Sequence, residues 1–145
     1  MKIVLFEPQI PQNTGNIVRT CAVTGSSLVL INPGYSLSDR WLKRAGLDYW
    51  EGVDLTLYET LEEYLAQETA PLAFFSSKAT TLYTDIVYQP HHVLVFGAET
   101  HGLPDTIPLD KRVRIPMLPD RRCLNLATSV GIGLYEALRQ QKKGF

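Results

Sequence analysis

The chain is poor in cysteine and has no long apolar run. Its 145 residues include two cysteines, Cys21 and Cys123, which lie far apart and form no C-x-x-C pair. This argues against a disulfide framework and against a zinc site, so no metal is expected. No apolar stretch approaches the roughly 20 residues needed to span a bilayer. The N-terminus turns acidic too soon for a signal peptide. The composition therefore indicates a cytoplasmic protein without membrane association.

An excess of positive charge is also missing. The chain has 14 Lys and Arg against 15 Asp and Glu, a net charge of −1. This balance argues against a generic, charge-driven nucleic-acid binder but leaves room for a local basic face. Basic residues cluster at 40–44, 111–114, 121–122 and 142–143. For any one cluster, solvated surface charge is the favoured interpretation.

Several common enzyme motifs are absent. The Gly-Ile-Gly run at 131–133 is followed by Glu136 where a dinucleotide motif requires glycine, and it lies within a predicted helix, where close helix packing is the favoured interpretation. Gly97 and Gly102 have the spacing of a phosphate loop, but Leu103-Pro104 follows where Lys and Ser or Thr are required. No serine stands in a G-x-S-x-G motif. The sequence thus supports neither a P-loop NTPase nor a serine hydrolase.

Short apolar runs are present and alternate with helical patterns. The predicted strands are nearly continuous in Val, Ile, Leu and Phe, as expected for strands buried on both faces, and span 2–6, 27–31, 53–57, 72–76, 93–96 and 113–115. The predicted helices span 15–23, 38–45, a segment that begins at a Thr60 cap, and 125–141. This alternation predicts one α/β domain over 1–145, with a mostly parallel sheet covered by helices on both faces.

Polar and turn-forming residues gather in three segments, 8–21, 96–104 and 115–126, that each follow or adjoin an apolar run. Ligands bind at the carboxyl ends of strands in open α/β sheets, so these segments together predict a site. In the first, Pro8 and Pro11 are expected to hold the chain extended, and Asn13 to cap the next helix.

The other two segments add a carboxylate, an amide and a thiol. Glu99 is the sole carboxylate of its turn and suits a ligand amine or hydroxyl. Asn125 is expected to cap the last helix. Cys123 stands beside Arg121 and Arg122, a setting that can make a thiol reactive, although a small buried packing residue is the favoured interpretation.

Together these segments, in this order and spacing, closely resemble the SPOUT class of RNA methyltransferases over essentially the whole chain. The resemblance is strongest to the small branch that consists of the catalytic domain alone, the tRNA (cytidine/uridine) 2′-O-methyltransferases of the wobble nucleotide. The residues that carry it are IVLFEP at 3–8, NTGNI at 13–17, RAGLDY at 44–49 and PMLPD at 116–120.

The resemblance implies an α/β fold whose C-terminal segment threads a loop to form a trefoil knot. It also implies a homodimer with the last helix at the interface and each site completed by the partner. The knot's loops would bind S-adenosylmethionine, largely through backbone groups. By resemblance, the residues lining this pocket are Phe75, Gly97, Gly102, Ile115, Cys123 and Leu124. The related enzymes usually carry Ser at the position of Cys123; a thiol is a weaker hydrogen-bond partner than a hydroxyl, whereas a backbone contact to the cofactor would survive the change.

By resemblance, Arg19 is the candidate that activates the ribose 2′-OH. A guanidinium is effectively always protonated, so Arg19 is alternatively expected to bind phosphate or to stabilise alkoxide charge. Asn13, Glu99 and Asn125 match the other polar motif positions and are expected to position ribose, Arg19 or cofactor. The expected partner is tRNA, bound at its anticodon stem-loop. Basic residues near aromatics are the candidates for its recognition, namely Lys78, Arg121, Arg122 and Tyr135.

Three other interpretations stay open. The chain is compatible with a methyltransferase of ribosomal RNA or of another tRNA site, with a catalytically silent RNA-binding module, and with a nucleotide-sensing domain that has no RNA partner. The joint presence of Asn13, Arg19, Glu99 and Asn125 argues against the silent module, because binding alone does not require all four.

Overall fold

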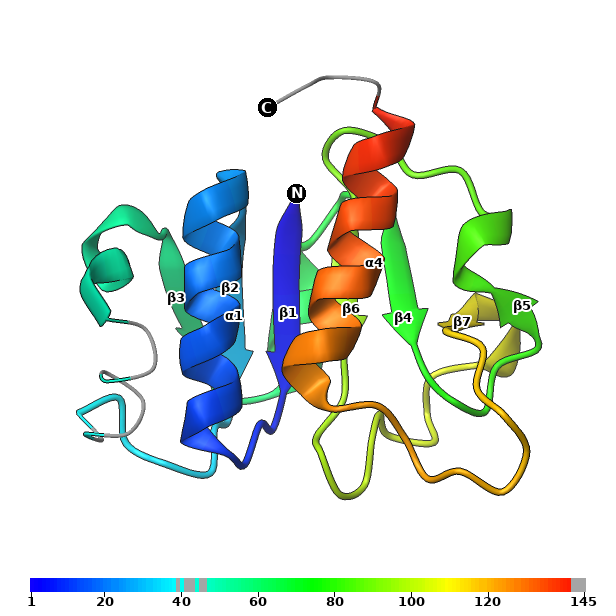
Figure 1. Cartoon of the computed structure of the whole chain (residues 1–145), viewed down its shortest axis with the longest axis horizontal. Coiled ribbons are helices and arrows are strands. Elements are labelled where there is room, and N and C mark those ends of the chain that lie inside the picture. Colours follow the sequence, from blue (N-terminus) through cyan, green and yellow to red (C-terminus); the bar gives the residue numbers. More distant parts are fainter. Residues whose placement is uncertain (39, 41–43, 45–46, 142–145) are drawn as a thin grey trace.

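A parallel sheet forms the centre of the computed structural model, which describes residues 1–38, 40, 44 and 47–141 (Figure 1). The strand order within these residues is β3-β2-β1-β6-β4-β7-β5, and every pairing is parallel. The strands are β1 (Lys2–Phe6), β2 (Ser27–Ile31), β3 (Leu55–Tyr58), β4 (Leu72–Phe75), β5 (Thr81–Leu82), β6 (Val93–Phe96) and β7 (Arg112–Arg114). The helices are α1 (Pro11–Thr24), α3 (Leu61–Gln67) and α4 (Leu126–Gln140), with short 3₁₀ turns η1 (Leu47–Gly52), η2 (Tyr83–Asp85) and η3 (Leu109–Lys111).

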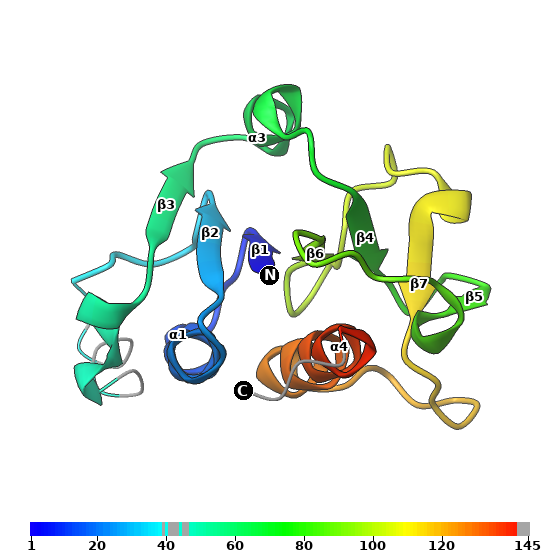
Figure 2. The ribbon, with the colours of Figure 1, turned by 90° about the horizontal axis from the view of Figure 1, so that it is seen from above.

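Helices cover both faces of this sheet. Figure 2 shows α1 and α4 side by side on one face and α3 on the other. Alternate residues of β1 point to opposite faces: Ile3 and Leu5 pack in the core cluster under α1 and α4, whereas Val4 packs in the cluster that includes Leu61 of α3. Both faces of the sheet are therefore shielded from water, which explains the nearly continuous apolar runs of its strands. The predicted architecture is confirmed.

The strand predictions are confirmed in position, with small shifts at some ends. The bounds predicted at 2–6, 27–31 and 93–96 match β1, β2 and β6. The strand expected at 53–57 begins two residues later, the one at 72–76 ends one residue earlier, and the one at 113–115 lies one residue earlier. Strand β5 was not predicted, because two residues are too few to show a periodic pattern. Most of the helix predicted over 38–45 lies outside the described residues.

The start of α1 differs from the expectation. Pro11 occupies the first turn of the helix instead of holding the chain extended, because its fixed φ suits that position and its missing N–H is not needed there. The expected cap is also wrong: Ile10 is the N-cap, without a side-chain hydrogen bond, and Asn13 lies inside the helix. The caps predicted at Thr60 and Asn125 are confirmed, since their side chains accept hydrogen bonds from the backbone N–H groups of Glu63 and Thr128.

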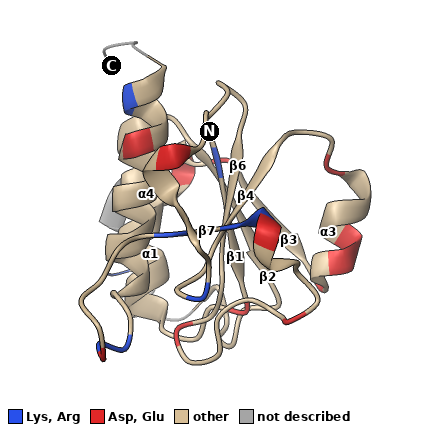
Figure 3. Ribbon diagram, turned by 90° about the vertical axis from the view of Figure 1, so that its right-hand side faces the viewer, with Lys and Arg blue, Asp and Glu red and all other residues tan. Residues whose placement is uncertain are grey.

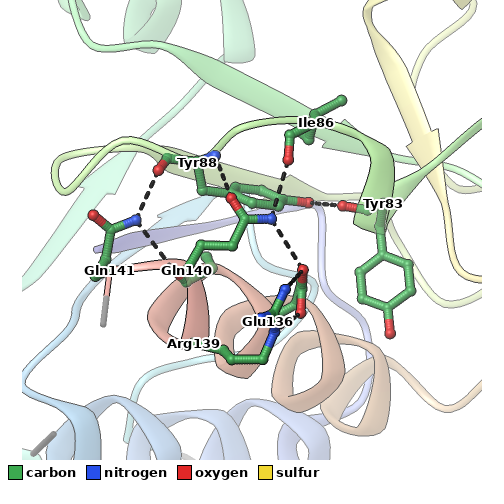
Figure 4. A network of polar contacts seen from close by, with 8 residues as sticks. Tyr83, Ile86, Tyr88, Glu136, Arg139, Gln140 and Gln141 are labelled. Atoms are coloured by element: carbon green, nitrogen blue, oxygen red, sulfur yellow. Dashed lines mark hydrogen bonds and ion pairs between the residues drawn. The ribbon is translucent and has the colours of Figure 1, made fainter. Parts of the chain in front are cut away.

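Polar contacts tie the C-terminal end of α4 to the chain that follows η2 (Figure 4). The Gln140 side chain accepts from the Tyr88 N–H at 2.9 Å and donates to the Ile86 carbonyl at 3.1 Å. Gln141 Nε2 donates to the Tyr88 carbonyl at 2.7 Å. These side-chain amides pair backbone groups that no strand partner reaches, and they fix the end of α4. Among the described residues, no helix is both long and apolar enough to span a membrane.

A nearly buried carboxylate joins β1 to the end of α3. Glu68 Oε2 accepts hydrogen bonds from Lys2 Nζ at 2.9 Å and from the Tyr64 hydroxyl, and Oε1 accepts from the Ala70 N–H at 3.0 Å. Burial by itself disfavours the charged form, but the hydrogen bonds prevail and lower the pKa of Glu68 to about 2.

We expect Glu68 to stabilise the fold at neutral pH and to lose that contribution in acid. Its folded pKa lies below the ordinary value of 4.5, so the contribution is complete above pH 4.5 and falls away as the pH drops toward 2. Glu68→Gln should lower the free energy of unfolding at pH 7 by about 1–3 kcal/mol and flatten this acid dependence. Urea denaturation at a series of pH values measures both effects, with the exposed Glu62→Gln as control. An equally steep acid dependence in the Glu68 variant would contradict the assignment.

Candidate active site

The candidate site lies at the carboxyl edge of the sheet, where the sheet reverses its order. Because all strands are parallel, the loops that follow β1, β6 and β7 emerge at the same edge, the lower one in Figure 1. From β1 the chain continues through α1 to β2 on one side, while β6 and β4 lie on the other side. The boundary between β1 and β6 is thus a topological switch point, the usual ligand position in such sheets.

Glu99, in the loop after β6, receives three hydrogen bonds from the segment that follows β1. Its Oε1 accepts from the Gln9 N–H at 2.8 Å, and its Oε2 accepts from the Ile10 N–H at 2.9 Å and from Asn13 Nδ2 at 3.2 Å. The first turn of α1 contains no acidic residue. Glu99 therefore supplies, from 89 residues away, the negative charge that a helix N-terminus favours.

Asn125 extends this network to α4. Its Nδ2 donates to Asn13 Oδ1 at 2.9 Å, while its Oδ1 accepts from the Thr128 N–H at 3.2 Å as the cap of α4. The cap fixes the orientation of both amides: the Asn125 oxygen must face the helix, so its NH₂ faces Asn13, whose own NH₂ then faces Glu99. The chain of contacts ends on Glu99, where a carboxylate accepts from every donor. We call Asn13, Glu99 and Asn125 the polar triad.

The loop after β6 folds back tightly on itself. Ala98 and Gly102 exchange backbone hydrogen bonds, with N···O distances of 3.3 and 2.9 Å, and Gly102 has a φ of +65°. A Cβ on Gly97 would lie 2.1 Å from the Gly102 carbonyl carbon and 2.3 Å from Leu103 N. Position 97 therefore accepts only glycine in this backbone, whereas Gly102 is required by its left-handed conformation.

The structure brings the segments of the expected cofactor pocket to one edge. The six residues come from the ends of β4, β6 and β7 and from the approach to α4, namely Phe75, Gly97, Gly102, Ile115, Cys123 and Leu124. The Phe75 side chain is buried and stacks on Phe96 with ring centroids 4.5 Å apart, so only its backbone is available to a ligand. Cys123 is exposed in the described chain, so the favoured interpretation as a buried packing residue is wrong.

Arg19 lies on α1, as Asn13 does, but it is not next to Asn13 on the helix surface. It is exposed and follows Asn13 by six residues, which places it about 9 Å along the helix axis and about 120° around it. The four expected RNA contacts lie on three elements: Lys78 after β4, Arg121 and Arg122 before α4, and Tyr135 on α4; all four are exposed. Figure 3 shows the basic residues of the loop before α4 and of β7, and the acidic residues of α3.

Two features of this edge were not anticipated. One is the pairing of Glu99 with backbone N–H groups, which sequence reasoning assigned to a ligand amine or hydroxyl. The other is Arg112, counted only as part of a basic cluster, which is 3% exposed and donates three hydrogen bonds to neighbouring loops. Its position directly before the strand predicted at 113–115 is the one signal that pointed to burial.

Proteins similar to this chain in sequence and in fold include tRNA methyltransferases. A tRNA (cytidine(34)-2′-O)-methyltransferase of Escherichia coli (strain K12) is 43% identical over 146 residues, covering 97% of this chain and 93% of the relative. One of Methylovorus glucosotrophus (strain SIP3-4) is 46% identical over 144 residues, covering 95% and 94%. A solved structure that concerns the 2-OH methylation of C/U34 on tRNA superposes with a TM-score of 0.91 at 41% identity, covering 97% and 95% of the two chains.

The family assignment agrees with these relatives and with the switch-point site. The SpoU rRNA Methylase family matches residues 1–135, which include the triad and every strand of the sheet. The chain belongs to the SpoU rRNA Methylase family.

Proposed function

We propose that the protein transfers a methyl group from S-adenosylmethionine to the ribose 2′-OH of the wobble nucleotide, a cytidine or modified uridine, in the tRNA anticodon loop. The observation that carries this proposal is the identity of 43–46% across nearly the full length of relatives named for that reaction. The polar triad supports it, because it joins the loops after β1 and β6 to the start of α4 at the switch point.

The residues at this edge fit S-adenosylmethionine. Its adenine requires apolar walls and backbone hydrogen-bonding groups, and the half-buried Ile115 and Leu124 stand at the two ends of the irregular segment between β7 and α4. Nothing lies within 4 Å of the place where a Cβ of Gly102 would stand, so the backbone is open to a ligand there. When bound, the cofactor supplies an electrophilic methyl group on a sulfonium.

The protein's part in the reaction is alignment and charge stabilisation. The triad holds the loops that would carry both reactants, and alignment of this kind accounts for several kcal/mol of a transfer barrier. As the C–S bond of the sulfonium breaks and the C–O bond forms, the 2′-OH proton passes to solvent water and S-adenosylhomocysteine leaves. Arg19 stabilises the negative charge that develops on the 2′ oxygen, since a guanidinium is a cation with several N–H donors. Arg121, Arg122 and Lys78 bind phosphates of the anticodon stem-loop, and Tyr135 stacks on a base.

We propose that the protein also has the knotted topology and the dimeric assembly that the resemblance implies. Chain 115–125 returns from β7 across the ends of β4 and β6 to reach Asn13, which is compatible with threading into a trefoil knot. We further propose a homodimer that packs through α4, so that Arg19 of one copy reaches the cofactor of the other. Such a dimer would explain why Arg19 lies apart from the triad of its own chain. The protein would act in the cytoplasm, where its tRNA substrates are.

Labelled S-adenosylmethionine and unmodified total tRNA test the proposal. After incubation, digestion to nucleosides and mass spectrometry should reveal 2′-O-methylcytidine or a 2′-O-methyluridine derivative. The signal should fall in Arg19→Ala, whose cofactor affinity is expected to stay near that of the wild type. Cofactor binding without any methylated nucleoside would overturn the tRNA assignment.

Ribosomal RNA is the second candidate substrate, because the description of the family that matches residues 1–135 names rRNA. The same assay with unmodified ribosomal RNA separates the two. Methylation of ribosomal RNA but not of tRNA would favour this alternative.

A further inference from the structure

A buried arginine outside the triad joins two loops at the same edge of the sheet. Arg112, the first residue of β7, donates from Nε to the Ile107 carbonyl at 3.0 Å, from Nη1 to Ser76 Oγ at 3.1 Å and from Nη2 to the Pro104 carbonyl at 2.7 Å. It forms no ion pair with any carboxylate of the described chain. A full charge is therefore buried on neutral acceptors alone, which is costly unless each hydrogen bond is kept.

The loop after β6 consequently has a separate anchor at each end. Residues 97–102 are held by Glu99 and by the pairing of Ala98 with Gly102. Residues 104–107 are held by their two carbonyls on Arg112. A cavity of about 730 Å³ is lined by Thr106, Ile107 and Pro108 and by Arg112 itself, so the guanidinium links this segment to the sheet at the cavity wall. Ile107 also packs in the core cluster, and its N–H donates to the Pro104 carbonyl at 3.2 Å.

The same guanidinium also fixes the turn after β4. Ser76 Oγ accepts from Arg112 and, at 3.2 Å, from the Lys78 N–H. The Lys78 ammonium in turn lies 4.0 Å from Asp105 of the loop after β6, with both side chains exposed. A surface ion pair of this length is weak. Arg112, which hydrogen-bonds to both, is therefore the stronger link between the turn after β4 and the loop after β6.

We infer that Arg112 is a positioning residue that sets segment 76–78, which carries the expected RNA contact Lys78, and the adjacent segment 104–107, whereas Glu99 sets the cofactor-facing segment 97–102. The inference rests on the proposed function. A guanidinium suits this role because its planar fork offers donors in fixed, divergent directions, which a single ammonium does not. Loss of Arg112 should thus weaken the use of tRNA and leave cofactor binding in place.

Steady-state kinetics and cofactor calorimetry on the full-length protein test this division. Arg112→Met should raise the KM for tRNA about tenfold, equivalent to the loss of roughly one charge-assisted hydrogen bond, while the Kd for S-adenosylmethionine changes less than about twofold. Ser76→Ala removes only one of the three contacts and should raise the KM about threefold. Lys111→Met is the matched control, because it removes a neighbouring exposed charge and should leave the KM within about twofold.

Three results would overturn the inference. The first is a cofactor Kd that rises as much as the KM for tRNA, because this would indicate general loss of structure. The second is an equal effect in Lys111→Met, because charge alone would then explain it. The third is an unchanged KM in Ser76→Ala, which decides the matter even if Arg112→Met does not fold. A wild-type protein inactive on tRNA would instead refute the proposed function.

Discussion

We expect Glu99→Gln to reduce methyl transfer about a hundredfold, the loss typical of reactive groups misplaced by about 1 Å. Both carboxylate oxygens accept hydrogen bonds: Oε1 from Gln9 N–H, and Oε2 from Ile10 N–H and Asn13 Nδ2. Glutamine has one oxygen, so its NH₂ must face at least one of these donors. The orientation of Asn13 cannot adapt, because its oxygen is committed to Asn125.

The same variant should lower the free energy of unfolding by about 1–3 kcal/mol, since backbone donors at the start of α1 lose an acceptor. Activity on tRNA and urea denaturation measure the two effects. Glu51→Gln, which alters an exposed carboxylate in η1, ahead of β3 and so on the side where that strand begins, is the control and should match the wild type in both. A Glu99 variant with wild-type activity would show that the triad does not align the site.

Gly97→Ala should abolish measurable cofactor binding, with a Kd for S-adenosylmethionine raised about a hundredfold or more. The added Cβ would stand 2.1 Å from the Gly102 carbonyl carbon, which is backbone and cannot rotate away. The loop must open by about 1 Å to restore a normal contact, and it then loses the pairing of Ala98 with Gly102. The expected pocket would be distorted at its backbone.

Calorimetry with S-adenosylmethionine measures this effect, and thermal unfolding shows how much of the fold survives. Gly52→Ala is the matched control, because a Cβ on this exposed glycine meets nothing within 4 Å. It should keep wild-type affinity. Wild-type affinity in Gly97→Ala would place the cofactor elsewhere, whereas lost affinity with a lowered but cooperative unfolding transition supports the site at this loop.

The two glycines of α4 show how far close packing can be predicted from the sequence. Close helix packing was expected for the Gly-Ile-Gly run at 131–133, and it is confirmed for Gly133, whose Cβ would lie 2.7 Å from the Phe75 ring. For Gly131 nothing of the same chain lies within 4 Å of that position, so close packing there stays a prediction for the proposed α4 interface. The two glycines differ only in which side of α4 they face, and a local pattern does not reveal what lies opposite.

The polar site residues show the same division between local and distant causes. Asn125 was correctly predicted as a cap, because capping depends on a helix start that lies next to it in sequence. Asn13 was given the same role and was wrong, because Pro11 starts the helix earlier and the partners of Asn13 are 86 and 112 residues away. Glu99 and Arg112 were likewise assigned to ligand or solvent, although their partners belong to other loops.

Local patterns predicted the order of the strands along the chain, the burial of both sheet faces and the caps of α3 and α4, and the motifs predicted the reaction by resemblance. These follow from periodicities and from neighbours within a few residues, which a single chain segment carries. Contacts between distant segments make Glu99, Asn13 and Asn125 one network, bury Arg112 and leave Cys123 exposed, and no local pattern predicts them. Those features arise because parallel strands bring their carboxyl ends to one edge, and the side chains that meet there are separated by up to 112 residues.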